Sequence, residues 1–151
     1  MDGSVVCELQ STDKFEAIHE LILKAPIFQR NIDNVLLEKA VILREKQQST
    51  GFGHGVAVAH GTLKGLDTIR IALGVSRKGI DFDYLDWYPV HLLFIVSSSQ
   101  KMQLEYLLAL SILTGLLRNK AVRDELLSYR EEGQIERALC DAFHRSLQFR
   151  T

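Results

Sequence analysis

The chain has 151 residues, a length typical of one domain with a buried core, and 46% of them are hydrophobic and 25% charged. Its net charge of −1 argues against nucleic-acid binding, and its two isolated cysteines, Cys7 and Cys140, predict neither a disulfide framework nor a metal cluster. The start of the chain does not resemble a signal peptide, and the most apolar stretch, residues 104–117, is shorter than the ~20 residues that span a bilayer. We therefore expect a reduced, cytoplasmic protein, one domain over residues 1–151, without direct membrane insertion.

The first part of the chain predicts a strand over residues 4–9 and two helices. Ser11 or Thr12 can cap the first helix, since a side-chain oxygen there accepts from an unpaired amide, and Pro26 ends it. Asn31 is expected to cap the second helix, with Asp33 in its first turn. The apolar stripe predicted for this helix consists of Ile32, Val35, Leu36, Ala40 and Leu43.

Further strands are predicted where apolar runs are too short for a helix. Residues 56–59 and 68–75 each predict a strand, and residues 81–86 a loop. The run 90–96, VHLLFIV, is apolar apart from His91, so we expect it at the centre of the sheet, and serines 97–99 are expected to end it.

The C-terminal part predicts three helices. Apolar residues cover nearly the whole circumference of residues 101–117, so this helix is expected to be buried on most sides. Asn119 is expected to cap a short second helix, and Gly133 to separate it from the last one. Strands that alternate with helices predict an α/β fold, a three-layer sandwich with helices on both faces of a mixed sheet.

A glycine-rich stretch, STGFGHGVAVAHG over residues 49–61, is the main candidate for chemistry. Glycines 51, 53 and 55 tolerate positive φ, so the loop could curl its amide groups around an anion. His60 follows a short predicted strand, at the end where α/β folds usually bind ligands. The stretch is not a dinucleotide fingerprint, because Val56 or Val58 occupies the third glycine position and a strand follows instead of a helix.

A specific resemblance appears over residues 44–61, which fit R-E-x-x-x-S-T-G-x-G-x-G-x-A-x-x-H-G. This pattern resembles the active-site segment of EIIA domains of the phosphoenolpyruvate-dependent phosphotransferase system, in their fructose, mannitol and nitrogen-regulatory class. A second block, GIDFDYLDWYPVHLLFIV over residues 79–96, is similar to that family's second block, and the likeness continues to about Phe143.

The resemblance implies that His60 accepts a phosphoryl group from an HPr-type phosphocarrier and passes it to an EIIB-type partner, without a metal or cofactor. It also places an active-site arginine at Arg44. The residue types agree, because a neutral imidazole is a nucleophile near pH 7 and phosphoryl transfer needs donors for the spread negative charge. The loop amides, Arg44 and the hydroxyls of Ser49 and Thr50 could be those donors. The absence of a fused transport segment favours nitrogen-type regulation slightly over sugar transport.

The sequence departs from the family pattern at four positions. Ala59 replaces a proline, His54 an asparagine and His91 an aspartate, and Tyr106 stands where many members have a second active-site histidine. Tyr106 can hydrogen-bond a phosphoryl oxygen or fix the tautomer of a neighbour. By hypothesis His54 compensates by donating to the phosphoryl group, while His91 has a structural role. The departures keep a second possibility open, a regulatory docking module with a degenerate EIIA site and no phosphorylation.

Overall fold

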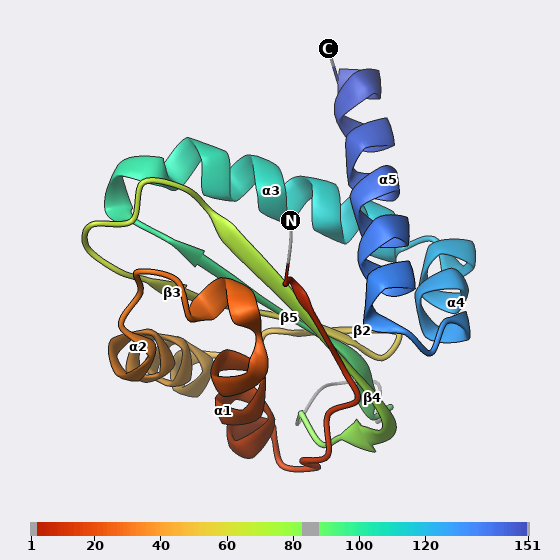
Figure 1. Cartoon of the computed structure of the whole chain (residues 1–151), viewed down its shortest axis with the longest axis horizontal. Coiled ribbons are helices and arrows are strands. Elements are labelled where there is room, and N and C mark those ends of the chain that lie inside the picture. The colour runs from red at the N-terminus through yellow and green to blue at the C-terminus, as the bar shows by residue number, and fades with distance from the viewer. Residues whose placement is uncertain (1–2, 83–87, 151) are drawn as a thin grey trace.

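The computed structural model describes residues 3–82 and 88–150 (Figure 1). The loop predicted over residues 81–86 therefore lies largely outside the described residues. At its start, Asp81 forms an isolated parallel bridge with Asp13, and Phe82 is fully buried.

Within the described residues, five strands form one mixed sheet. Their spatial order is β1 (Val5–Cys7), β4 (Arg70–Ile80), β5 (Val90–Ser98), β3 (Val56–Thr62) and β2 (Gly51–Gly53). β1 is parallel to β4 and β3 is parallel to β5, whereas the β4–β5 and β2–β3 pairs are antiparallel. The prediction that residues 90–96 form the central strand is confirmed. The strand continues through Ser97 and Ser98, which pair with the last residues of β3, so the serines end it later than predicted.

Helices cover both faces of the sheet (Figure 1). The helices α1 (Lys14–Lys24) and α2 (Asn34–Gln47), with the 3₁₀ turn η1 (Pro26–Phe28), pack on one face. The 3₁₀ turn η2 (Gln100–Met102), α3 (Gln103–Leu117), α4 (Lys120–Ser128) and α5 (Glu132–Arg150) follow β5, and the last three helices pack on the other face. Each face has its own apolar cluster, because successive side chains of a strand point to opposite faces. The predicted three-layer α/β sandwich is confirmed.

The N-terminal caps of the first two helices differ from the prediction. Asp13, not Ser11 or Thr12, caps α1. Its carboxylate accepts from the amides of Phe15 and Glu16 at 3.0 and 3.1 Å. Asp33, not Asn31, caps α2 in the same way. In both cases the aspartate comes later in the chain than the predicted cap, and an aspartate caps as well as asparagine or serine. Pro26 follows the end of α1 as predicted, and it begins η1.

The apolar stripe predicted for α2 was wrong. Leu37, Val41 and Glu45 are the buried residues of this helix, four residues apart, whereas Leu36 and Leu43 are exposed. Apolar residues lie all around α2, so periodicity alone offered more than one candidate face. The packing of Val41 against β3 at Gly61 shows which one is buried.

The C-terminal helices differ from the prediction in two respects. α3 buries one face through Ala109, Leu113 and neighbouring residues, but Leu104 is 80% exposed and the next turn is also open, so burial on most sides was wrong. Gly133 lies inside the first turn of α5 and does not precede the helix. Asn119 caps α4 as predicted, accepting from the Ala121 amide at 2.9 Å. Across residues 3–82 and 88–150, no helix combines the length and apolar character that a bilayer crossing requires.

Candidate functional site

His60 lies near the carboxyl end of β3, as expected. Val56 and Val58 belong to the cluster under α3, and side chains alternate along a strand, so His60 also faces α3. There its ring stacks on the ring of Tyr106, with the centroids 4.3 Å apart and the planes 22° apart. The next residue, Gly61, faces α2, where a Cβ atom would come within 2.8 Å of a Val41 methyl group. Glycine is therefore required beside the histidine.

The edge of β3 is open where His60 lies. The short strand β2 pairs only with Val56 and Ala57, and the last hydrogen bond joins the Val58 amide to the Thr50 carbonyl at 3.2 Å. Beyond that point no described strand covers this edge. A cavity of about 210 Å³ occupies the place, and its lining includes His60, Tyr106, Arg44, Ser49, Thr50 and Gly51. The structure thus brings together residues from α2, the β2–β3 segment and α3.

Burial and charge set the protonation states at this cavity. Burial lowers the pKa of His60, and the nearby guanidinium of Arg44 lowers it further. Burial raises the pKa of the Tyr106 phenol, although Arg44 acts in the opposite direction. Arg44 is held by donation from its Nη1 to the Gln48 carbonyl at 2.8 Å. At neutral pH the site therefore presents a neutral imidazole, a neutral phenol and one cation, a combination suited to a nucleophile that attacks an anionic group.

Ser49 and Thr50 line the cavity, but their hydroxyls donate to protein groups. Ser49 Oγ donates to the Phe82 carbonyl at 3.0 Å, and Thr50 Oγ1 donates to the carboxylate of Glu45. The Thr50 amide also donates to Glu45, at 3.0 and 3.2 Å to its two oxygens. These bonds fix the chain between α2 and β2.

The glycine-rich stretch forms a hairpin instead of the predicted anion-binding loop. Gly53, the last residue of β2, and the two turn residues His54 and Gly55 all have positive φ. The Gly51 amide donates to Ser49 Oγ at 3.3 Å. The glycines therefore allow a tight reversal, and the amides of Thr50 and Gly51 already donate to Glu45 and Ser49.

His54 and His91 lie apart from His60. Both line another cavity, of about 380 Å³, together with Pro89 and the start of α4. His91 Nδ1 lies 2.7 Å from the Ser76 carbonyl, and its ring packs against Gly55 and Gly79, which agrees with a structural role. His54 is not among the residues that line the His60 cavity.

Sequence reasoning assigned no role to Glu45 and Lys14. Glu45 is only 2% exposed, and its carboxylate lies 3.2 Å from the Lys14 ammonium, which α1 supplies. The signal in the sequence was the position of Glu45, a charged residue four positions after Val41 on the same face of α2. Within the described ranges no group of three or more His, Cys, Asp and Glu side chains could hold a metal ion.

The fold and the cavity define a class of protein: a mixed-sheet α/β domain that presents one neutral histidine beside an arginine at an open strand edge. Residues 2–141 match the family model described as "Phosphoenolpyruvate-dependent sugar phosphotransferase system, EIIA 2". The chain belongs to this family, whose members take part in phosphoryl transfer between proteins.

Individual relatives agree with the family. The chain is 30% identical over 132 residues to the fructose-specific EIIABC component of Bacillus subtilis. The aligned region covers 87% of this chain but only 21% of that protein. The crystal structure of the nitrogen regulatory protein IIA-Ntr from Neisseria meningitidis superimposes with a TM-score of 0.82 at 27% identity, covering 91% of this chain and 93% of that one. The complex of mannitol enzyme IIA with phosphorylated enzyme IIB from Escherichia coli gives a TM-score of 0.76 at 17% identity over 93% and 96% of the two chains, a likeness of fold.

Proposed function

We propose that His60 is a phosphoryl carrier, accepting the group from a phosphorylated HPr-type protein and passing it to an EIIB-type partner. The unprotonated ring nitrogen attacks phosphorus, a new P–N bond forms, and the bond to the donor histidine breaks with its electron pair returning to the donor ring. Transfer onward repeats the exchange with the partner's nucleophile. The observation that carries this proposal is the neutral, stacked imidazole of His60 in the same cavity as Arg44.

Arg44 and Tyr106 would stabilise the transferred group. Arg44 supplies the positive charge for the phosphoryl oxygens, and Tyr106 orients the imidazole by stacking while its protonated phenol can donate a hydrogen bond. Ser49 and Thr50 would have to turn their hydroxyls from Phe82 and Glu45 to donate as well. His54 would have to move from its own cavity, so we expect the smallest contribution from it.

The partners proposed here follow from the family. A mannitol IIA of the same fold is found in complex with a phosphorylated IIB, which supports an EIIB-type acceptor for this chain. The relatives include both a fructose-specific EIIABC component and a nitrogen regulatory protein, and we propose that the phosphorylated state serves either sugar transport or regulation. We propose a single cytoplasmic EIIA domain over residues 1–151 in either case.

Incubation with labelled phosphoenolpyruvate, Enzyme I and HPr tests the proposal. The protein should acquire an acid-labile phosphoryl group, and His60→Ala should abolish it. His144→Ala, which changes an exposed histidine of α5, should be labelled normally. Tyr106→Phe should retain the stack and lose only the phenol, so labelling should slow without being abolished. Labelling of His60→Ala at the normal rate would refute the carrier role.

A docking module without phosphorylation remains the second candidate. It is favoured by the engagement of the Ser49 and Thr50 hydroxyls and of the Gly51 amide within the protein, which leaves fewer donors ready for a phosphoryl group. Absence of label on the folded wild-type protein, with a known EIIA labelled in the same mixture, would support this candidate instead.

A further inference from the structure

A further cavity lies at the carboxyl ends of the parallel strands β3 and β5. It has a volume of about 740 Å³, within the range of ~300–1,000 Å³ typical of small-molecule sites. The last residue of β3 and the loop after it, residues 62–67, form one wall, and the turn η2 with the residue before it forms another. Figure 1 shows this loop beside the start of α3. The cavity has no lining residue in common with the His60 cavity.

Ser99 points to a ligand at this place. It lines the cavity and is only 6% exposed, and its hydroxyl oxygen has no hydrogen-bond partner in the described part of the chain. A serine just before a helix normally accepts from one of the first amides, but Ser99 makes no such bond. No described side chain caps the start of α3 either. A buried hydroxyl without a partner is costly, and a bound group would remove that cost.

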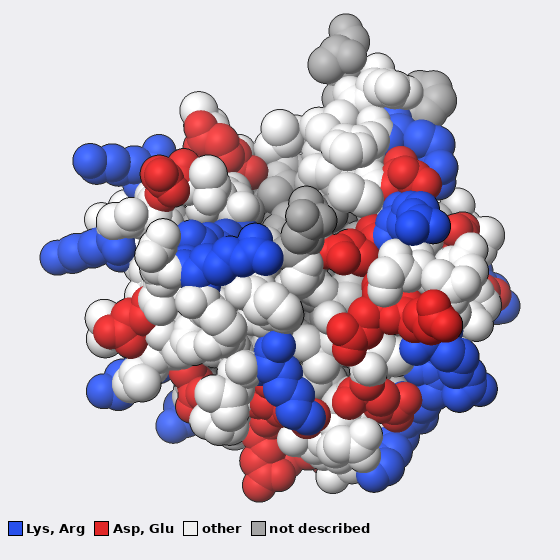
Figure 2. Space-filling model, viewed as in Figure 1, with Lys and Arg blue, Asp and Glu red and all other residues white. Residues whose placement is uncertain are grey.

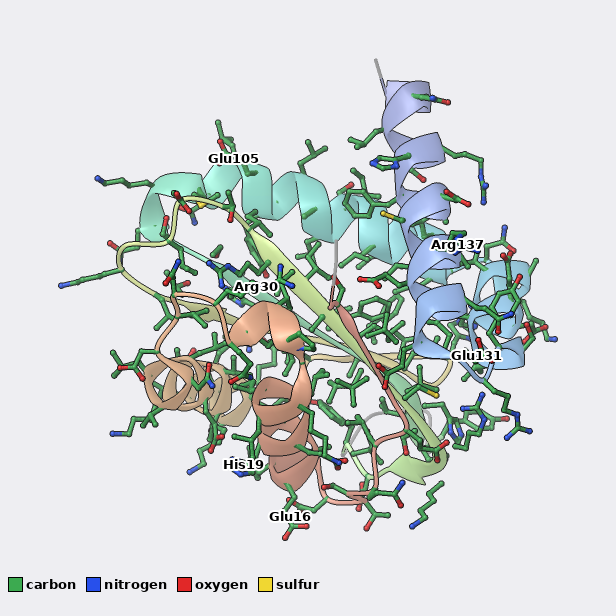
Figure 3. All side chains as sticks on the ribbon, in the orientation of Figure 1. Glu16, His19, Arg30, Glu105, Glu131 and Arg137 are labelled. Carbon is green, nitrogen blue, oxygen red and sulfur yellow. The ribbon has the colours of Figure 1, made fainter. Side chains whose placement is uncertain are left out.

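The charges around Ser99 favour an anion. The free amides at the start of α3 contribute a partial positive charge near this place, and Lys64 and Lys101 line the cavity. Glu105, in the first turn of α3, points away from the sheet in Figure 3 and is not among the lining residues. In Figure 2, basic side chains project from this end of the molecule with acidic ones between them.

We propose that this cavity binds a small organic phosphate. The phosphate would lie beside Ser99, accepting from Ser99 Oγ and from the ammonium groups of Lys64 and Lys101. The cavity is much larger than a phosphate ion, so the ligand has a further part. Asp67 lines the cavity and accepts hydrogen bonds only, so that part carries hydroxyl groups and no second anionic group.

The position suggests what binding would do. Tyr106, which stacks on His60, follows η2 within the first turn of α3. A ligand that fixes the start of this helix would also fix the ring against the histidine. This consequence depends on the carrier role proposed above, whereas binding itself does not.

Nuclear magnetic resonance titration of the full chain tests binding separately from phosphoryl transfer. We expect glycerol 3-phosphate to bind saturably, with the largest amide shifts over residues 63–67 and 99–103. Ser99→Ala and Lys101→Gln should each weaken binding about tenfold, the effect of losing one hydrogen bond to a charged group. Inorganic phosphate should bind more weakly than glycerol 3-phosphate at the same residues. Asp67→Asn should remove this difference in affinity between the two ligands.

Matched controls identify a false positive. Lys39→Gln changes the same charge on α2 and should leave binding unchanged, as should Arg44→Gln in the His60 cavity. Ser99→Ala should not lower the melting temperature, while Ser97→Ala removes a hydroxyl that donates to the Arg70 carbonyl at 3.4 Å and should lower it. Shifts centred on His60, equal binding by Ser99→Ala, or no saturation would overturn the proposal.

Discussion

Replacing Glu45 should destabilise the protein more than any other change of a single charged residue discussed here. Its carboxylate lies 3.2 Å from the Lys14 ammonium and accepts from both the amide and the hydroxyl of Thr50. α2 carries Glu45, α1 carries Lys14, and Thr50 precedes β2. One carboxylate therefore joins two helices to the hairpin that leads to His60.

The size of the effect follows from burial. The side chain of Glu45 is fully buried and that of Lys14 is 10% exposed, so Glu45→Ala leaves a buried ammonium without this carboxylate. Removing one partner of a buried pair costs about 3–5 kcal/mol. For a chain of this length that loss corresponds to a fall in melting temperature of about 6–20 °C. Lys14→Met should cost less, because Thr50 continues to donate to Glu45.

Urea and thermal unfolding of Glu45→Ala, Lys14→Met and the double variant Lys14→Met/Glu45→Ala would measure the coupling. The double variant should be more stable than the sum of the two single losses predicts, because it removes both members of the ion pair together. Lys14→Met keeps the test informative if Glu45→Ala fails to fold. Strict additivity, or a loss below about 1 kcal/mol in Glu45→Ala, would contradict the reasoning.

Three further predictions address other parts of the molecule. His60 should titrate below its usual pKa, because burial and Arg44 disfavour the imidazolium, and Arg44→Gln should raise the pKa in an NMR pH titration. Burial alone would raise the pKa of Glu20, but hydrogen bonds from Lys24, Gln10 and Ser11 outweigh it and lower the pKa to about 2. The ionised Glu20 side chain therefore contributes about 3 kcal/mol to the free energy of unfolding above its usual pKa of 4.5, and this contribution is lost as the pH falls from 4.5 towards 2. Glu20→Gln should remove this pH dependence from unfolding curves. Leu37→Ala should cost about 2–5 kcal/mol, whereas Leu36→Lys, on the exposed side of the same helix, should change stability by less than about 0.5 kcal/mol.

Local patterns predicted the parts of the fold that local chemistry determines. The apolar run over residues 90–96 is buried on both faces, and only a central strand accommodates such a run. Asn119 caps α4 because its own side chain satisfies an amide two residues ahead. The spacing of Arg44, the glycines and His60 identified the family because the three parts belong to one continuous helix–hairpin–strand segment.

Features that depend on distant residues could not be predicted in this way. The packing of α2 on β3 decides which face of α2 is buried. One side of α3 is exposed because no further described layer covers it. The pairing of Glu45 with Lys14 joins residues 31 positions apart on two helices. The stack of Tyr106 on His60 likewise needs the register between β3 and α3, and the sequence placed this tyrosine near the site only through its correspondence with a family position.

The length of β2 explains how both helical layers reach one histidine. His60 faces the α3 side of the sheet, whereas Arg44 belongs to α2, which packs on the other side. A longer β2 would continue along β3 and separate them. Because β2 ends its pairing at Ala57, the edge of β3 beside His60 stays open, and Arg44 can line the same cavity as Tyr106. The turn at residues 53–55 reverses the chain at the other end of β2, next to Val56, so the opening beside His60 depends on where β2 begins, at Gly51. Extending the pairing by replacing Gly51 with a β-branched residue would be expected to narrow the cavity before it altered the protonation of His60 itself.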